Sequence, residues 1–182
     1  QQEFSFEHFG MPVLYPATVA EFLEYGLHAA AMSRYSGCWV ALKLAAPLCD
    51  GGETVSVDPD FPTIALPPRD ISKPLGKAAS YVYIPGFNID TEHNLYYERH
   101  AAVRAYARAN QIDRIVLRSE RDRVGIAAAG KSFTDVRQAL RDLGYDDRAL
   151  TKAGIRLLKI GLLCPIEPEI AREFARGLSD II

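Results

Sequence analysis

One stretch of this sequence has residue types and a spacing that can bind phosphate. Residues 125–132 read Gly-Ile-Ala-Ala-Ala-Gly-Lys-Ser and fit the phosphate-loop pattern GxxxxGK[ST]. In that motif a flexible loop of backbone amides surrounds phosphate oxygens, while the lysine and the serine reach phosphate and magnesium. A small phosphate-loop nucleotide-binding protein is therefore one interpretation of the sequence.

The context of the motif argues against a loop. A phosphate loop follows a complete apolar strand, whereas Gly125 follows a charged turn, so the strand itself must lie in residues 124–129. The next apolar strand, residues 155–163, ends without an acidic residue that could hold magnesium. A short turn at a helix N-terminus could still bind an anion or a carboxylate of a neighbouring domain, with Lys131 and Ser132 as the contacts.

The other candidates for catalysis or metal binding form incomplete sets. The histidines make neither HxH nor HExxH and the cysteines make no CxxC, so we predict no metal site, and histidines that are solvated or act as caps. An odd number of cysteines, two of them in apolar surroundings, predicts free thiols in a reducing compartment. These residues are His8, His28, His93 and His100, and Cys38, Cys49 and Cys164.

Arg34 is a third candidate contact, beside Lys131 and Ser132. It stands in Ser-Arg-Tyr-Ser-Gly at the end of a predicted helix, which places a guanidinium beside an aromatic ring at a chain reversal. Two roles for Arg34 remain open. It could pair with carbonyls or a carboxylate for structural reasons, or it could lie in an interface.

Composition limits the class of protein. The 182 residues are 48% hydrophobic and 24% charged, as in an ordinary globular core, and the formal charge is -2. This charge offers no basic field for nucleic acid. No apolar run approaches the roughly 20 residues that span a bilayer, and the first residues do not resemble a signal peptide. We therefore expect a cytosolic protein without nucleic acid or membrane as a partner.

The expected elements place an α/β unit after a Pro/Gly-rich connector. A capping box at Thr18 opens a helix that Gly37 ends, with Phe22, Leu23 and Leu27 on its apolar side. Strand and helix then alternate toward the end of the chain, which predicts right-handed crossovers and a parallel sheet. We predict helices at 19–35, 92–110, 133–143 and 167–178, and strands at 38–46, 54–57, 81–84, 124–129, 155–163 and from 179.

The composition divides the chain into three parts. Seven prolines and several glycines between residues 47 and 94 forbid a long helix, so residues 48–94 read as a connector. Residues 1–47 would then be the tail of one α/β domain, and residues 95–182 most of a second. Because the last predicted strand is only beginning where the sequence stops, we expect the chain to be a fragment.

With these residues in place, the chain resembles the fused indolepyruvate ferredoxin oxidoreductases of the thiamine-diphosphate-dependent 2-oxoacid:ferredoxin oxidoreductase superfamily. Three stretches carry the resemblance, and their order and spacing agree with the family. Residues 12–43 look like the last helix and strand of a pyrimidine-binding domain. Residues 125–140 look like the first strand and helix of a transketolase C-terminal-like domain, and residues 155–169 resemble its next strand and helix.

The resemblance implies oxidative decarboxylation of an aryl 2-oxoacid such as indolepyruvate to its acyl-coenzyme A, with ferredoxin as the acceptor. Thiamine diphosphate, magnesium and 4Fe-4S clusters are implied for the parent protein and none for this chain, whose catalytic residues would lie elsewhere. Arg34, Lys131 and Ser132 would then line an interface with other domains of the same polypeptide, and a homodimer is plausible through a free sheet edge. A non-enzymatic interaction domain of the same fold remains an alternative.

Overall fold

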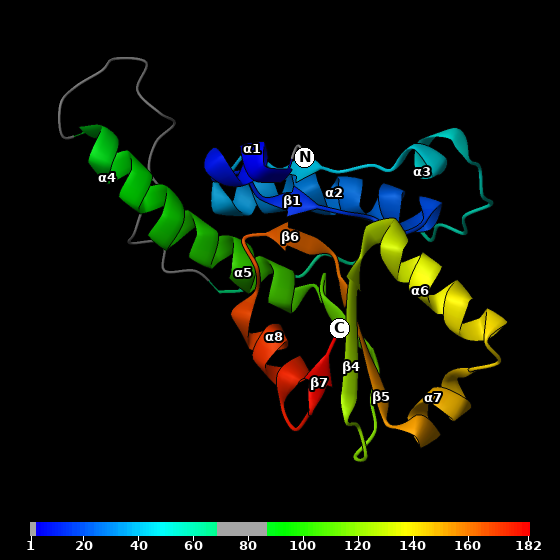
Figure 1. Cartoon of the computed structure of the whole chain (residues 1–182). Coiled ribbons are helices and arrows are strands. Elements are labelled where there is room, and N and C mark those ends of the chain that lie inside the picture. The colour runs from blue at the N-terminus through cyan, green and yellow to red at the C-terminus, as the bar shows by residue number, and fades with distance from the viewer. Residues whose placement is uncertain (1–2, 69–86) are drawn as a thin grey trace.

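The computed structural model describes residues 3–68 and 87–182, which form a mixed α/β structure with two small sheets (Figure 1). Its elements in chain order are α1 (Glu3–His8), β1 (Val13–Leu14), α2 (Val19–Ser36), β2 (Ala41–Leu42), α3 (Ala46–Asp50), α4 (Phe87–His93), the π-helical segment η1 (Asn94–Arg99), α5 (His100–Ala109), β3 (Arg114–Leu117), β4 (Val124–Ala129), α6 (Gly130–Asp142), α7 (Asp147–Ala153), β5 (Ile155–Ile160), β6 (Leu162–Cys164), α8 (Pro168–Ala175) and β7 (Asp180–Ile181).

The larger sheet has the strand order β3-β5-β4-β7. β4 is parallel to both β5 and β7, which confirms the predicted parallel pairing, and the predicted bounds of β4 agree with the structure. The sheet is nevertheless mixed, because β3 pairs antiparallel with β5. β3, a four-residue strand at the edge of the sheet, was not predicted from the sequence. α6 and α8 lie on opposite sides of β4 in Figure 1.

The smaller sheet, in the order β2-β1-β6, joins the two ends of the chain. β1 is parallel to β2 and antiparallel to β6. The strand predicted over residues 155–163 exists but is not continuous, since it divides into β5 and β6 at Gly161. A Cβ at Gly161 would lie 2.4 Å from the hydroxyl oxygen of Tyr25 and 2.5 Å from the carbonyl oxygen of Ile112, so only glycine fits between the two strands.

α2 begins and ends where the sequence predicts, within one residue. The hydroxyl of Thr18 accepts a hydrogen bond from the amide of Glu21, and Gly37 ends the helix in the left-handed region at φ 73°. The face that α2 buries was predicted wrongly. Its buried side chains are Tyr25, His28, Met32 and Ser36, whereas Phe22, Leu23 and Leu27 are exposed.

The main hydrophobic core lies between α2 and α5. It unites side chains from both ends of the chain: Leu14, Tyr25, Met32, Cys38, Val103, Tyr106, Ala107, Ile112 and Leu162. Tyr106 donates or accepts at His28 Nδ1, with 2.9 Å between the two heavy atoms, so this buried imidazole is satisfied inside the core.

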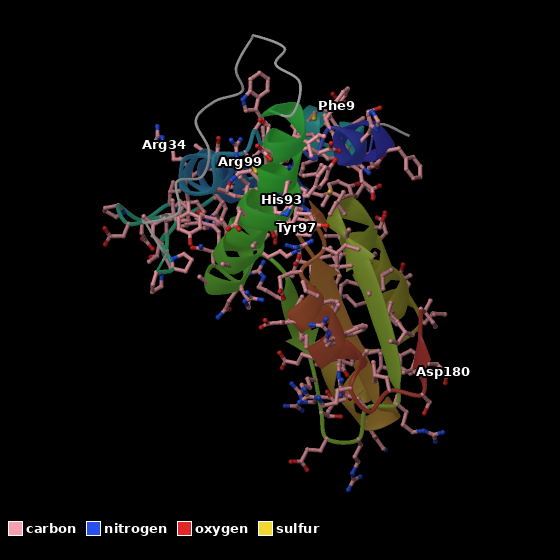
Figure 2. The ribbon with its side chains drawn as sticks, turned by 90° about the vertical axis from the view of Figure 1, so that its left-hand side faces the viewer. Phe9, Arg34, His93, Tyr97, Arg99 and Asp180 are labelled. Carbon is pink, nitrogen blue, oxygen red and sulfur yellow. The ribbon has the colours of Figure 1, made fainter. Side chains whose placement is uncertain are left out.

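α4, η1 and α5 follow one another without a break, so the helix predicted over residues 92–110 exists but begins earlier, at Phe87. It runs through residue 94, where the connector was expected to end. The rings of His93 and Tyr97 stack at 4.4 Å on the outer side of this helix (Figure 2).

The expected connector contains a short helix, α3, whose second residue is Pro47, at a position where the missing amide costs nothing. The strand predicted over residues 54–57 is wrong, and the one over 81–84 lies outside the described residues. The strand predicted over 38–46 is reduced to β2, and Trp39 beside it is 81% exposed. None of the helices in the described part of the chain is long and apolar enough to cross a bilayer.

Candidate functional site

The carboxyl ends of β4 and β5 form the edge where open α/β sheets commonly bind ligands. Ala129 and Ile160 are paired there, and α6 starts directly after β4. In this chain the edge is covered by residues that precede and open α2. The amide of Tyr15 donates to the carbonyl of Gly161 at 2.8 Å, and α2 lies across the same end of the sheet in Figure 1.

The GxxxxGKS stretch is a strand followed at once by a helix. Residues 124–129 pair with β5 throughout, and the amide of Ala127 also donates to the carbonyl of Ile182 at 2.9 Å, so these amides do not surround an open cradle. Gly130 adopts the left-handed region at φ 50°, and a Cβ there would lie 2.4 Å from three carbon atoms of the Tyr15 ring. Tyr15 therefore fills the space over the turn.

The three candidate contacts are not brought together. Lys131 pairs with Asp135 one turn later on α6, at 2.5 Å, and Ser132 is exposed beside it. Arg34 is in the last turn of α2, 15 residues and so about 22 Å of helix away from Val19, at the end that lies near Tyr15. Its side chain points outward (Figure 2) and has no hydrogen bond or ion pair with another described residue.

Glu21 is the centre of the contact between α2 and the larger sheet. One carboxylate oxygen accepts from the ammonium of Lys159 on β5 and, at 2.9 Å, from the guanidinium of Arg114 on β3. The other oxygen accepts from the amide of Ala17 at 2.9 Å. The reciprocal arm of the predicted capping box thus reaches the residue before Thr18, and the same side chain anchors the helix to two strands.

Lys159 is the most buried charge of this cluster, with 3% of its side chain exposed. Burial lowers the pKa of Lys159, and the carboxylate of Glu21 opposes that shift. Its ammonium also reaches the hydroxyl of Tyr25 at 3.3 Å, and that hydroxyl donates to the carbonyl of Ile112. Burial raises the pKa of Tyr25, and the charge of Glu21 adds to the effect. Apart from Arg114 Nε, which is buried without a hydrogen-bond partner among the described residues, the cluster is satisfied from within the chain.

Asp113 secures the bend between β5 and β6. Its carboxylate accepts from the amides of Gly161 at 2.7 Å and Leu162 at 2.9 Å. Burial raises the pKa of Asp113, and these two hydrogen bonds act in the opposite direction. The carboxylate therefore substitutes for a strand partner at the point where the two sheets meet.

A second buried ion pair lies at the opposite end of the larger sheet. Arg156 and Asp122 are 2.9 Å apart and both nearly inaccessible. Arg156 also donates to the carbonyls of Phe174 and Arg176 at the C-terminal end of α8. Burial alone would raise the pKa of Asp122, but hydrogen bonds from Ser119 and Arg156 outweigh it and lower the pKa. This pair fixes α8 to the sheet.

The histidine prediction was wrong for two of the four residues. His28 and His100 are buried, and burial lowers the pKa of each. Glu167 is also buried: it caps α8 by accepting from the amides of Glu169 and Ile170, and it pairs with Arg108 at 2.5 Å. A favourable position in the helix dipole is thus only part of its role.

Sequence reasoning missed Glu21, Tyr25 and Lys159 as a group. A signal for them is present, because Arg156 and Lys159 interrupt an otherwise apolar buried strand, and a buried charge requires a partner. Nothing in the spacing of the sequence indicates that the partner of Lys159 lies 138 residues earlier.

The outward side of α2 exposes a row of apolar side chains. Phe22, Leu23 and Leu27 are 39%, 44% and 43% exposed, and Ala30 is also exposed. Leu23, Leu27, Ala30 and Arg34 follow the spacing i, i+4, i+7 and i+11, which places them on one side of the helix. We call this set, with Phe22, the outer face of α2.

The described residues do not fit a bound cluster or diphosphate. Within residues 3–68 and 87–182, no group of three or more His, Cys, Asp or Glu side chains is arranged to hold a metal ion. Cys38 is buried, Cys49 exposed and Cys164 half-buried, and all three are free thiols. The ring of Tyr15 occupies the place over Gly130 where a phosphate would have to sit.

One family model matches part of the chain. No curated protein matches the chain. The family model for the indolepyruvate ferredoxin oxidoreductase middle domain matches residues 113–182, which run from Asp113 to the end of β7 and include the whole of the larger sheet. This match supports, over residues 113–182, the resemblance drawn from the sequence.

Proposed function

We propose that this chain is a non-catalytic part of an indolepyruvate ferredoxin oxidoreductase and that it holds other domains of the same polypeptide in place. The parent enzyme would oxidatively decarboxylate an aryl 2-oxoacid to its acyl-coenzyme A, pass electrons to ferredoxin, and carry thiamine diphosphate, magnesium and 4Fe-4S clusters in other segments. The family match over residues 113–182 supports the reaction class. We also propose that the parent protein is cytosolic and forms a homodimer, and that the domains of this chain divide at residues 47 and 94.

The outer face of α2 carries the docking part of this proposal. An amphipathic helix normally buries its apolar side, yet α2 buries Tyr25, His28 and Ser36 and exposes Phe22 and Leu27. Apolar residues grouped on one exposed helix side, with an arginine at the end, have the composition of a protein interface. Arg34 is that arginine, and it has no partner within the part of the chain that the structure describes.

The buried carboxyl edge supports the non-catalytic role. Its titratable groups bind one another: Glu21 accepts from Lys159 and Arg114, and Asp113 accepts from two amides. Tyr15 covers the Gly130 turn. This edge is therefore proposed to act as a rigid joint between α2 and the larger sheet. We also propose that the larger sheet belongs to a transketolase C-terminal-like domain.

The test is the double substitution Leu23→Gln and Leu27→Gln in the uninterrupted parent protein. We expect reduction of a viologen acceptor with indolepyruvate, coenzyme A and thiamine diphosphate to fall at least about tenfold, as docked domains separate. The isolated chain with the same substitutions should keep its stability within about 1 kcal/mol. Leu143→Gln, at a leucine that is 72% exposed after α6, is the matched control and should leave turnover unchanged.

Unchanged turnover and assembly in the Leu23/Leu27 variant would overturn the docking role, and absence of oxoacid-dependent reduction by the parent would favour the interaction-domain alternative. The phosphate-loop alternative has its own readout. Magnesium-dependent ATP or GTP binding that disappears with Lys131→Ala would support it against the present proposal.

A further inference from the structure

A pocket of about 410 Å³ opens between α1, α5 and the turn that leads from β6 to α8. It is separate from the outer face of α2 and from the carboxyl edge of the sheet. Volumes of this size are typical of sites for small molecules. Its charged and polar lining comes from Glu7, His100 and Arg104, and from Glu3, which is paired with Lys43. Its apolar lining includes Val13, Tyr96 and Ile166.

His100 is the first residue that points to a ligand. Its side chain is 4% exposed, and Nε2 lies 2.8 Å from the carbonyl oxygen of Gly10. A carbonyl can only accept, so the proton of the neutral ring is on Nε2 and the lone pair is on Nδ1. Nδ1 has no hydrogen-bond partner among the described residues. It is also accessible to solvent, because Arg114 Nε is the only fully buried side-chain nitrogen or oxygen there that lacks a partner. Because His100 lines the pocket, this free acceptor is available to a ligand there.

Two unpaired charges of opposite sign complete the lining. Neither Glu7 nor Arg104 forms an ion pair with any described residue, and they do not pair with each other although both face the pocket. Arg104 is held by a hydrogen bond from Nε to the carbonyl of Ile166 at 3.1 Å, which leaves its terminal nitrogens for other acceptors. Burial raises the pKa of the Cys164 thiol nearby, so the thiol adds no negative charge at neutral pH.

We propose that this pocket binds a free α-amino acid with an apolar side chain. The ammonium group would donate to the carboxylate of Glu7 and to Nδ1 of His100, and the carboxylate would accept from Arg104. The apolar side chain would pack against Val13, Tyr96 and Ile166. A ligand that carries both charges satisfies each unpaired group of the pocket, which an anion or a cation alone does not.

The test is calorimetric titration of the full chain with L-phenylalanine and L-leucine. Two analogues isolate the charges: 3-phenylpropionate lacks the ammonium group and phenethylamine lacks the carboxylate. Each analogue should bind at least about tenfold more weakly than L-phenylalanine, because each loses a charge-assisted hydrogen bond. Equal binding of 3-phenylpropionate would show a simple anion site and overturn the proposal.

Substitutions then locate the site. Glu7→Gln and Arg104→Gln should each weaken binding of L-phenylalanine at least about tenfold, while Glu120→Gln and Arg141→Gln, at exposed charges elsewhere, leave it unchanged. His100→Gln keeps a donor for the carbonyl of Gly10 and removes the Nδ1 acceptor. Its melting temperature is measured alongside its binding. If this variant unfolds, binding by Glu7→Gln and Arg104→Gln tests the proposal. Unaltered binding in both of these variants, or no binding of either amino acid up to about 10 mM, would overturn the proposal. This inference stands or falls independently of the proposed docking role.

Discussion

The two sides of α2 differ in a way that runs against their hydropathy. The inner side buries a tyrosine, a histidine and a serine, and each makes a hydrogen bond: Tyr25 to Ile112, His28 with Tyr106, and Ser36 to Met32. The outer side exposes Phe22, Leu23 and Leu27. Tyr25 and His28 are therefore buried where distant segments supply their hydrogen-bonding partners, whereas Ser36 bonds within its own helix. Met32 is the apolar residue that α2 buries beside them, while Phe22, Leu23 and Leu27 stay exposed.

The largest effect on stability is expected from a substitution in the polar anchor under the first turn of α2. Glu21→Gln leaves the ammonium of Lys159 buried without a carboxylate, so we expect a loss of about 3–5 kcal/mol in the free energy of unfolding, measured with urea. The double variant with Lys159→Met should recover a large part of it. Glu173→Gln, which breaks a half-exposed pair with Arg118, should cost less than about 1 kcal/mol. Equal losses for the Glu21 and Glu173 variants would contradict the anchor role.

The joint beside α2 is tested at Gly130. Gly130→Ala forces an alanine into the left-handed region and drives its Cβ into the ring of Tyr15, so we expect a loss of roughly 3 kcal/mol. Gly144→Ala is the control, because Gly144 also has a positive φ, of 85°, but open space around it. Its cost should stay near about 1–2 kcal/mol. The comparison uses chemical denaturation, and equal costs would show that Tyr15 yields without strain.

The two sides themselves are compared by truncation to alanine. Met32→Ala removes a fully buried side chain and should cost about 2–3 kcal/mol, whereas Leu27→Ala on the outer face should cost less than about 1 kcal/mol in the isolated chain. Thermal and urea unfolding of both variants give the two values. A larger loss for Leu27 than for Met32 would mean that the outer face is covered within this chain.

The smallest expected effect is on pH dependence. The folded pKa values of His28 and His100 lie below 6.5 because both rings are buried, so the unfolded chain binds more protons as pH falls through 6.5. Stability should therefore decrease by about 1 kcal/mol between about pH 7.5 and about pH 5.5, with a slope of at most about 1.4 kcal/mol per pH unit for each ring. A flat profile of unfolding midpoints would refute the assignment.

Local sequence signals predicted the elements of the structure better than their contacts. The Thr18 cap, the Gly37 stop and β4 agree with the structure because turn chemistry and apolar runs determine them. β3 was missed because it is four residues long, and the split at Gly161 because it depends on Tyr25 and Ile112 from other segments.

The candidate site was predicted only in part. The sequence correctly indicated that residues 124–129 would be a strand, which removes the loop from the GxxxxGKS stretch. It placed Lys131 and Ser132 together but gave no reason to separate them from Arg34. The buried cluster around Glu21 could not be found from spacing, since pairs of charges far apart in sequence meet only when the tertiary fold brings them together.

The π-helical segment η1 is a point at which this chain could lose one residue. The amide of His100 donates to the carbonyl of Leu95, five residues earlier, so the long helix contains one residue more than an α-helix of the same path would need. Deleting a single residue between Asn94 and Arg99 would let this stretch return to α-helical bonding while α4 and α5 keep their orientation. The chain can thus change length by one here without moving the core on either side.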